Sequence, residues 1–153
     1  MDTPEHLDEG IDLEDKQAVF TLGVTSKLAD VPAHSIRQYI DMGLIIPFKL
    51  ESKRHLFSKR DLARLKHIRE LIHENGLNFA GVRTLMAMTP CWAIRKCNES
   101  DKHSCDAYKE NFKPCWMASE KGKNCRNMDC RNCEVYHSLD QAGGIKSLLS
   151  TLL

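Results

Sequence analysis

The stretch FTLGVTSKLADVPAHSIRQYIDMGLI, residues 20–45, decides the fold of the first half of this chain. A short extended entry at residues 19–22 leads into a predicted helix over residues 24–29. The next three residues, Asp30-Val31-Pro32, break that helix. We expect its inward side chains to be Val24, Leu28 and Ala29.

A second helix is predicted from about Pro32 to Met42, because proline tolerates the first turn of a helix. Gly43 then follows as a C-cap. The apolar side chains spaced to face the core are Ile36, Tyr39 and Ile40. Two short helices joined by a tight turn form a helix-turn-helix, in which polar residues at the start of the second helix face the major groove of DNA.

A basic hairpin is expected next, with short strands at residues 44–46 and 55–57 joined by a polar loop. Residues 18–88 hold eleven bases and six acids, and six of those bases cluster in and after the hairpin. The six are Lys49, Lys53, Arg54, Lys59, Arg60 and Arg64. This density is typical of a phosphate-binding surface, and a merely solvated basic face is the alternative.

Two more helices are predicted after the hairpin. The pair Ser58 and Asp61 fits an S-x-x-[DE] start, and this helix runs to Asn75-Gly76. Asn78 caps a shorter helix that Pro90 ends. The apolar positions expected in the core are Leu62, Leu65, Ile68, Ile72, Val82, Leu85 and Met86.

Taken in order, these residues resemble the MerR family of bacterial transcription regulators, and more closely its heat-shock-repressor (HspR-like) branch. The resemblance covers about residues 19–88. The matching stretches are Phe20-Thr21-Leu22-Gly23, Ala29-Asp30-Val31, Ser35-Ile36-Arg37-Gln38-Tyr39, Met42-Gly43-Leu44-Ile45, His55-Leu56-Phe57-Ser58, Asp61-Leu62 and Gly76-Leu77-Asn78-Phe79-Ala80-Gly81-Val82. The resemblance implies a winged helix-turn-helix that binds a two-fold operator in double-stranded DNA as a homodimer.

The resemblance also implies the residues that meet DNA. The recognition-helix candidates are His34, Ser35, Arg37, Gln38 and Tyr39, and the wing candidates are Lys53, Arg54 and His55. Arginine can contact guanine or phosphate, glutamine can contact adenine, and loop lysine or arginine attracts phosphate. One alternative is that Tyr39 is a core aromatic residue. Another is that His34 and Ser35 are exposed residues at the helix start without a role.

Three features depart from the family pattern. His55 stands in place of the usual wing arginine, and Ile40 stands in place of the glutamate that commonly follows the recognition-helix tyrosine. Pro90 interrupts the chain where the long dimerisation helix would continue. A short helix over residues 145–153, with apolar side chains at Ile145, Leu148, Leu149, Leu152 and Leu153, is our candidate dimer surface. Packing onto the chain's own core is the alternative.

All seven cysteines lie in a segment with two similar halves. Pro90-Cys91-Trp92 recurs as Pro114-Cys115-Trp116, and Cys105-Asp106-Ala107-Tyr108 recurs as Cys133-Glu134-Val135-Tyr136. Cys97 and Cys125 occupy comparable places, and Cys130 is extra. The segment resembles the "two-CW" cysteine-rich segments appended to bacterial signalling and regulatory proteins.

A segment with few large aliphatic side chains cannot fold on apolar burial alone, so we expect a metal or cluster. An iron-sulfur cluster is favoured, and zinc is the alternative because only one C-x-x-C pair is present. Metal-free reactive thiols are a third reading. The candidate ligands are Cys91, Cys97, Cys105, Cys115, Cys125, Cys130 and Cys133. His103 and His137 are expected at the surface, and Trp92 and Trp116 either shield the centre or form a small core.

The predicted architecture is mainly α. An acidic disordered tail over residues 1–17 precedes the winged helix-turn-helix at 18–89. A small irregular cysteine-rich metal-binding module follows at 90–137, and a linker with a short amphipathic helix occupies 138–153. No apolar run approaches the ~20 residues of a spanning helix, and the protein is predicted to be cytoplasmic, with no membrane partner.

The predicted function is that of a DNA-binding transcription regulator, not an enzyme, because no catalytic constellation can be argued from the residues. The cysteine-ligated centre would sense redox state, an oxidant, nitric oxide or metal, and RNA polymerase is a further candidate partner. One alternative is a regulator with purely structural zinc that a protein partner controls. Another is a cofactor-bearing redox protein with a vestigial helix-turn-helix.

Overall fold

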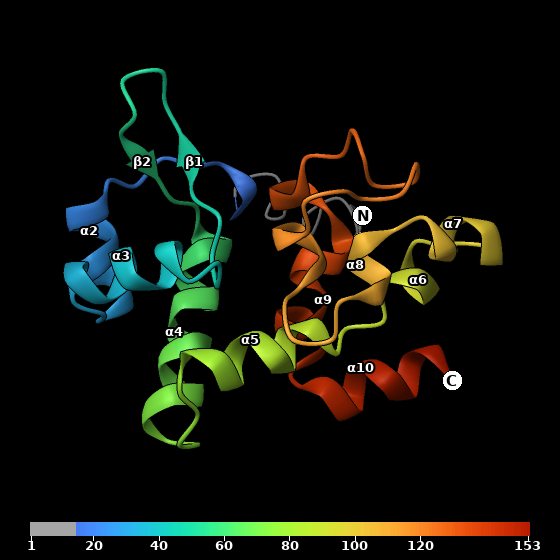
Figure 1. Ribbon diagram of the computed structural model, residues 1–153. Coiled ribbons are helices and arrows are strands. Elements are labelled where there is room, and N and C mark those ends of the chain that lie inside the picture. The colour runs from blue at the N-terminus through green and yellow to red at the C-terminus, as the bar shows by residue number, and fades with distance from the viewer. Residues whose placement is uncertain (1–14) are drawn as a thin grey trace, which may run out of the picture. The chain divides into compact units, whose positions relative to one another are not determined.

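The computed structural model describes residues 15–153 (Figure 1). The chain divides into two compact units, the first ending at Glu70 and the second spanning Leu71–Leu153. The expected mainly helical fold with a small two-stranded wing is confirmed. Most of the predicted acidic tail, residues 1–14, lies outside the described part. No helix of the described chain is both long and apolar enough to cross a membrane.

Helix α2, Leu22–Ala29, begins two residues earlier than predicted. The reason is the Thr21 side chain, which accepts a hydrogen bond from the backbone N–H of Val24 at 3.3 Å. The predicted inward face is wrong in part, because Val24 and Leu28 are 45% and 49% exposed. The side chains that α2 buries are Thr25 and Ala29. Small buried side chains let the helix pack closely on its neighbour.

Helix α3, Ala33–Asp41, follows Pro32 at the N-cap, as the sequence predicts. Ile36 and Tyr39 are its buried side chains. Gly43, at φ 78°, turns the chain after the helix into a conformation that favours glycine. α2 and α3 pack together to form the expected helix-turn-helix (Figure 1).

The wing is an antiparallel pair of two-residue strands, β1 at Phe48–Lys49 and β2 at His55–Leu56 (Figure 1). The prediction of a first strand at residues 44–46 was wrong. Leu44 instead lies fully buried in the turn after α3, where its N–H donates to the Tyr39 carbonyl at 2.9 Å. Burial and this local bond keep the segment out of the hairpin.

Helix α4, Lys59–His73, starts at the predicted capping box. The Ser58 N–H donates to Asp61 Oδ2 at 2.7 Å, and the Asp61 N–H donates to Ser58 Oγ at 3.2 Å. The helix ends slightly before the predicted Asn75-Gly76. Its side chains in the core include Leu65, Ile68 and Leu71.

In the second unit, helix α5, Phe79–Ala87, begins after the predicted cap, because Asn78 Oδ1 accepts from the Gly81 N–H at 2.8 Å. Short helical turns then follow α5. They are α6 Cys91–Ile94, α7 Glu99–His103, α8 Asp106–Lys109, η1 Cys115–Met117 and η2 Cys130–Asn132. Longer loops separate several of these turns, as expected for an irregular module.

The chain ends in two packed helices, α9 at Glu134–Ala142 and α10 at Ile145–Leu152. Gly143 and Gly144, at φ 80° and 153°, form the sharp connection between them. Leu148 of α10 is buried where the helix packs beside α9. The predicted amphipathic helix therefore forms and packs within its own unit.

Candidate functional site

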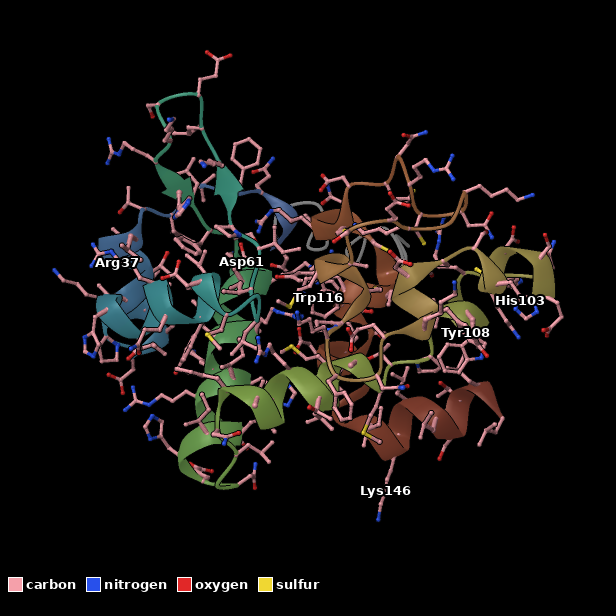
Figure 2. All side chains as sticks on the ribbon, in the orientation of Figure 1. Arg37, Asp61, His103, Tyr108, Trp116 and Lys146 are labelled. Carbon is pink, nitrogen blue, oxygen red and sulfur yellow. The ribbon has the colours of Figure 1, made fainter. Side chains whose placement is uncertain are left out.

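Helix α3 separates its core side chains from its candidate DNA contacts. Ile36 is fully buried, whereas Arg37 and Gln38 are exposed. His34 is also exposed, and Ser35 is half-buried. The helix thus offers hydrogen-bond donors and acceptors on its open side, and Figure 2 marks Arg37 among them. Such side chains can read base edges in a major groove.

Tyr39 differs from the other recognition-helix candidates because it is only 2% exposed. Burial raises the pKa of its phenol, and the nearby Arg69 guanidinium partly opposes that rise. The ring belongs to the core of the first unit. This placement matches the alternative that the sequence left open for Tyr39.

The wing presents its basic candidates around a tight turn. Lys53 and Arg54 are exposed, and His55 is half-buried in β2. The Leu50 N–H donates to the Arg54 carbonyl at 2.9 Å, and the Lys53 N–H donates to the Leu50 carbonyl at 2.8 Å. Lys53 has φ 68°, a left-handed conformation unusual for a lysine. The turn therefore fixes two cations at the tip of the hairpin.

One basic residue of the predicted phosphate-binding surface is misassigned. Arg64 is 2% exposed, so it cannot belong to a surface in this fold. Its Nε donates to the Leu44 carbonyl at 2.8 Å and joins α4 to the turn after α3. Charge counting missed this because the partner lies 20 residues earlier in the chain. The other five bases are exposed or half-buried.

The second candidate site is the cysteine-rich segment, whose two halves repeat the same local structure. Cys91 and Cys115 each open a helical turn directly after a proline N-cap. Cys105 and Cys133 each occupy the N-cap position of the following helix, α8 or α9. Equivalent cysteines of the sequence repeat therefore stand at equivalent points of the fold.

The aromatic residues repeat as well. Trp92 meets Tyr108 edge-on, with ring centroids 5.4 Å apart and planes at 87°. Trp116 meets Tyr136 in the same way, at 4.9 Å and 80°. Figure 2 labels one ring of each pair, Tyr108 and Trp116. Each tryptophan thus packs against the tyrosine of its own half, which favours the small-core interpretation of these rings.

Several thiols have polar neighbours. The Cys91 and Cys115 side chains hydrogen-bond one another, which lowers the Cys91 pKa to about 7 and raises that of Cys115. Arg95 hydrogen-bonds Cys125, whose pKa is nevertheless raised because burial outweighs that contact. Asn124 Nδ2 donates to Cys97 Sγ at 3.4 Å.

Cys130 has a different neighbour, since Lys121 Nζ donates to its Sγ at 2.9 Å. Neither Lys121 nor the other polar partners of the thiols carry a distinct signal in the sequence. Nothing in their spacing separates them from the many other polar residues of the segment. Only the folded loops bring them to sulfur.

Five thiols line one small pocket of about 20 Å³. They are Cys91, Cys97, Cys105, Cys115 and Cys125. Gly122 closes over this pocket, because a Cβ at that position would lie 3.2 Å from Cys105 Cβ. Within residues 15–153, no three Cys, His, Asp or Glu side chains are already arranged to hold a metal ion. The soft thiol donors suit iron or zinc, but binding requires them to draw closer.

The two histidines of the segment differ from each other. His103 is exposed, as expected. His137 is buried, so the expectation of a surface residue was wrong. Its Nε2 lies 2.6 Å from the Arg131 carbonyl oxygen, a hydrogen bond that links α9 to η2 and occupies that nitrogen.

The fold of residues 20–89, two helices in a helix-turn-helix followed by a basic wing, defines a winged helix-turn-helix DNA-binding domain. These same residues match the model of the MerR HTH family regulatory proteins. Residues 20–89 are thus similar to the MerR HTH family regulatory proteins in sequence and have a winged helix-turn-helix fold.

Individual relatives support this assignment. The chain is 32% identical over 77 residues to the HTH-type transcriptional regulator GlnR of Bacillus anthracis, which covers 49% of this chain and 59% of the relative. It is 25% identical over 77 residues to the putative heat shock protein HspR of Streptomyces coelicolor, which covers 50% of this chain and 51% of the relative. The chain thus spans little more than half the length of these relatives. The family match ends at residue 89, before the first cysteine.

Proposed function

We propose that this protein is a transcription regulator that binds a two-fold operator in double-stranded DNA as a homodimer. The observation that carries the proposal is the division of α3, which buries Ile36 and Tyr39 while it exposes Arg37 and Gln38. The wing adds two cations, Lys53 and Arg54, on a turn that backbone hydrogen bonds hold in place. Phosphate attraction from the wing and base reading from the helix are the two parts of DNA recognition.

The test begins with selection of operator sequences from random duplex DNA with the full chain. Arg37→Ala is expected to abolish the preference for the selected sequence over unrelated DNA, because arginine reads base edges. Lys53→Ala is expected to weaken binding to all sequences alike and to reduce the salt slope by about 1. Lys146→Ala is the control, since Lys146 points away from α10 in the second unit (Figure 2). Full operator preference in Arg37→Ala would contradict the recognition-helix assignment.

The proposal includes a sensory centre in the cysteine-rich segment. Seven thiols within 43 residues, five of them around one pocket, support a cysteine-ligated centre that responds to redox state, an oxidant, nitric oxide or metal. An iron-sulfur cluster is the first candidate and zinc the alternative, and bound iron would supply redox chemistry that zinc lacks. A change at the centre would alter how bound operator is presented to RNA polymerase.

Anaerobic purification followed by iron, zinc and acid-labile sulfide assays tests the centre. Stoichiometric iron and sulfide, with operator binding or transcription that changes on oxidation, support a cluster sensor. A zinc protein whose operator binding and transcription ignore oxidants would instead support the structural-zinc regulator. Absence of both metals would contradict the centre while leaving the DNA-binding proposal to its own test.

The homodimer needs a surface other than the long helix of the family. α10 buries Leu148 within its own unit but leaves Leu152 and Leu153 38% and 101% exposed. We propose that this exposed apolar end contacts a second copy. Leu152→Glu is then expected to give a monomer by light scattering, whereas Lys146→Glu on the same helix leaves the dimer intact. A dimer in the Leu152→Glu variant would contradict an interface at the end of α10.

A further inference from the structure

The repeat relates six of the seven cysteines in three pairs. The pairs are Cys91 with Cys115, Cys97 with Cys125, and Cys105 with Cys133. Structure supports this pairing, because each half has the same proline-capped turn, the same edge-on tryptophan and tyrosine, and the same N-cap cysteine. Cys130 has no counterpart in the first half.

The three cysteine pairs differ in whether both members line the small thiol pocket. Both members of the first pair and both members of the second line it. Cys105 lines it without its counterpart Cys133. Cys130 also lies outside its lining and contacts Lys121 instead. Two complete repeat-related pairs therefore surround one space between the halves.

Contacts within each pair agree with a shared location. Cys91 and Cys115 are hydrogen-bonded through their side chains. Cys97 influences Cys125 electrostatically, although less strongly than Cys133 does from outside the pocket lining. Asn124 joins the second pair, since it precedes Cys125 in the chain and donates to Cys97 Sγ. Each pair thus links one half of the segment to the other.

We propose that Cys91, Cys97, Cys115 and Cys125 bind one thiolate-ligated metal centre shared by the two halves, and that Cys105, Cys130 and Cys133 are not ligands. This inference rests on the cysteine-ligated centre proposed above and names its ligand set. Four thiolates are the number that a structural zinc ion or an iron-sulfur cluster takes.

The polar neighbours of the second pair suit such a centre. Four thiolates around a divalent ion leave a net charge of −2, which a partly buried site must offset. The Arg95 guanidinium hydrogen-bonds Cys125, and its Nη2 also donates to the Asn124 carbonyl at 2.8 Å. Asn124 in turn donates to Cys97. Donors of this kind orient metal ligands and stabilise their charge.

The thiol pocket is small. A volume of about 20 Å³ has room for roughly one water-sized body. A single ion fits there once the four thiols close on it. Metal and sulfide assays on the same samples decide between zinc and an iron-sulfur cluster without altering the ligand set.

The test uses the full chain purified anaerobically, with one Cys→Ser substitution at a time. Wild-type protein is expected to carry about one centre per chain. Each of Cys91→Ser, Cys97→Ser, Cys115→Ser and Cys125→Ser is expected to lose at least tenfold in affinity for the metal. Cys130→Ser is the matched control, because Cys130 lies outside the pocket lining, and it should keep the wild-type metal content. Loss of the centre in Cys130→Ser, or its retention in Cys97→Ser, overturns the proposal.

Ligand variants can also lose metal by failing to fold, so a second measurement uses wild-type protein alone. Thiols are alkylated with iodoacetamide before and after chelation, and the labelled positions are mapped by mass spectrometry. The protection that disappears on chelation should fall on the four proposed ligands. Protection that maps instead to Cys130 and Cys133 overturns this ligand set but leaves a cysteine-ligated centre standing. A wild-type chain without iron or zinc overturns both, while operator binding remains a separate result.

Discussion

The helix-turn-helix unit and the cysteine-rich segment hold their helices in place by different means. The first unit has a continuous apolar core, in which Ile36, Leu44, Phe57, Leu65 and Ile68 are each 0% exposed. In residues 91–133, all of which the structure describes, the buried apolar side chains are few. They are Ala107, Pro114 and Cys133.

Polar links replace apolar burial in the cysteine-rich segment. Asp101, 7% exposed, accepts from the Asn98 N–H at 3.2 Å and from Asn124 Nδ2 at 3.3 Å. Lys123 Nζ lies 3.5 Å from the same carboxylate. One aspartate therefore ties the first half of the segment to the loop of the second. With so few buried apolar side chains, the cysteine-rich segment needs a further constraint, which the proposed centre would supply.

Removal of the metal is expected to have the largest effect and to act on one region only. Structural zinc supplies about 10–16 kcal/mol of apparent folding free energy in zinc-finger peptides, so a chelator should melt residues 91–133. The apolar core of the first unit should stay folded. Hydrogen exchange read by mass spectrometry compares the two regions in one sample. Unchanged protection of residues 91–133 after complete metal removal would show that polar links suffice.

Phe57→Ala is expected to destabilise the first unit by about 3–5 kcal/mol, because it empties a fully buried aromatic site. Phe57 also pairs through its backbone with Phe20, whose carbonyl accepts the Phe57 N–H at 2.8 Å. Phe112→Ala is the matched change in the cysteine-rich segment, where Phe112 is 67% exposed. It should alter stability by no more than about 0.5 kcal/mol. Urea unfolding curves of the two variants measure the contrast, and similar losses in both would contradict it.

Arg64→Met is expected to cost roughly 1–3 kcal/mol, because it leaves the buried Leu44 carbonyl without its guanidinium donor. Lys66 lies two residues further along α4 and is exposed, so Lys66→Met should change stability little. Thermal unfolding of both variants gives the difference. The salt slope of DNA binding provides a second reading, since a buried arginine releases no counterion. A slope reduced in Arg64→Met would restore that residue to the phosphate-binding surface.

The smallest effects are expected at the two capping boxes, one in each region. Ser58→Ala removes the cap of α4, and Asn98→Ala removes the cap of α7. Each should cost about 0.5–2 kcal/mol. Local hydrogen exchange should show the first loss in the helix-turn-helix unit and the second in the cysteine-rich segment. If Asn98→Ala raised hydrogen exchange only within α7, the polar links of Asp101 would not hold the two halves of the segment together.

Local sequence signals predicted much of the fold. Pro32, Ser58 and Asn78 each mark a helix start within a residue or two of its place in the structure. The caps at Ser58 and Asn78 are predictable because each is joined to its helix by a bond that spans three residues. Pro32 makes no side-chain cap bond, and it starts α3 because its fixed φ suits the beginning of a helix. The repeated cysteine and tryptophan pattern likewise reappears as repeated local structure. Recognition-helix and wing candidates, apart from Tyr39, lie on accessible positions for the same local reasons.

Errors arose where distant residues decide the outcome. The strand expected at residues 44–46 is instead a buried turn held by Arg64, and that one bond also removes the arginine from the surface. The inward face of α2 depends on how closely its neighbour packs, which hydrophobicity alone does not reveal. His137 is buried, and its Nε2–H donates to the Arg131 carbonyl of the preceding turn, a contact that its sequence context did not indicate.

By itself, the sequence determined the helix-turn-helix, its caps, the basic wing and the two-half cysteine repeat, because each depends on residues near one another in the chain. Tertiary structure alone decided which thiols meet, since Asn124 reaches Cys97 across 27 residues and Arg95 reaches Asn124 across 29. It also decided that Arg64 is a core residue, through a partner 20 residues away. Sequence spacing predicts contacts between residues that are close along the chain. The thiols of a shared centre come from separate loops, so only the folded structure shows which of them line one pocket.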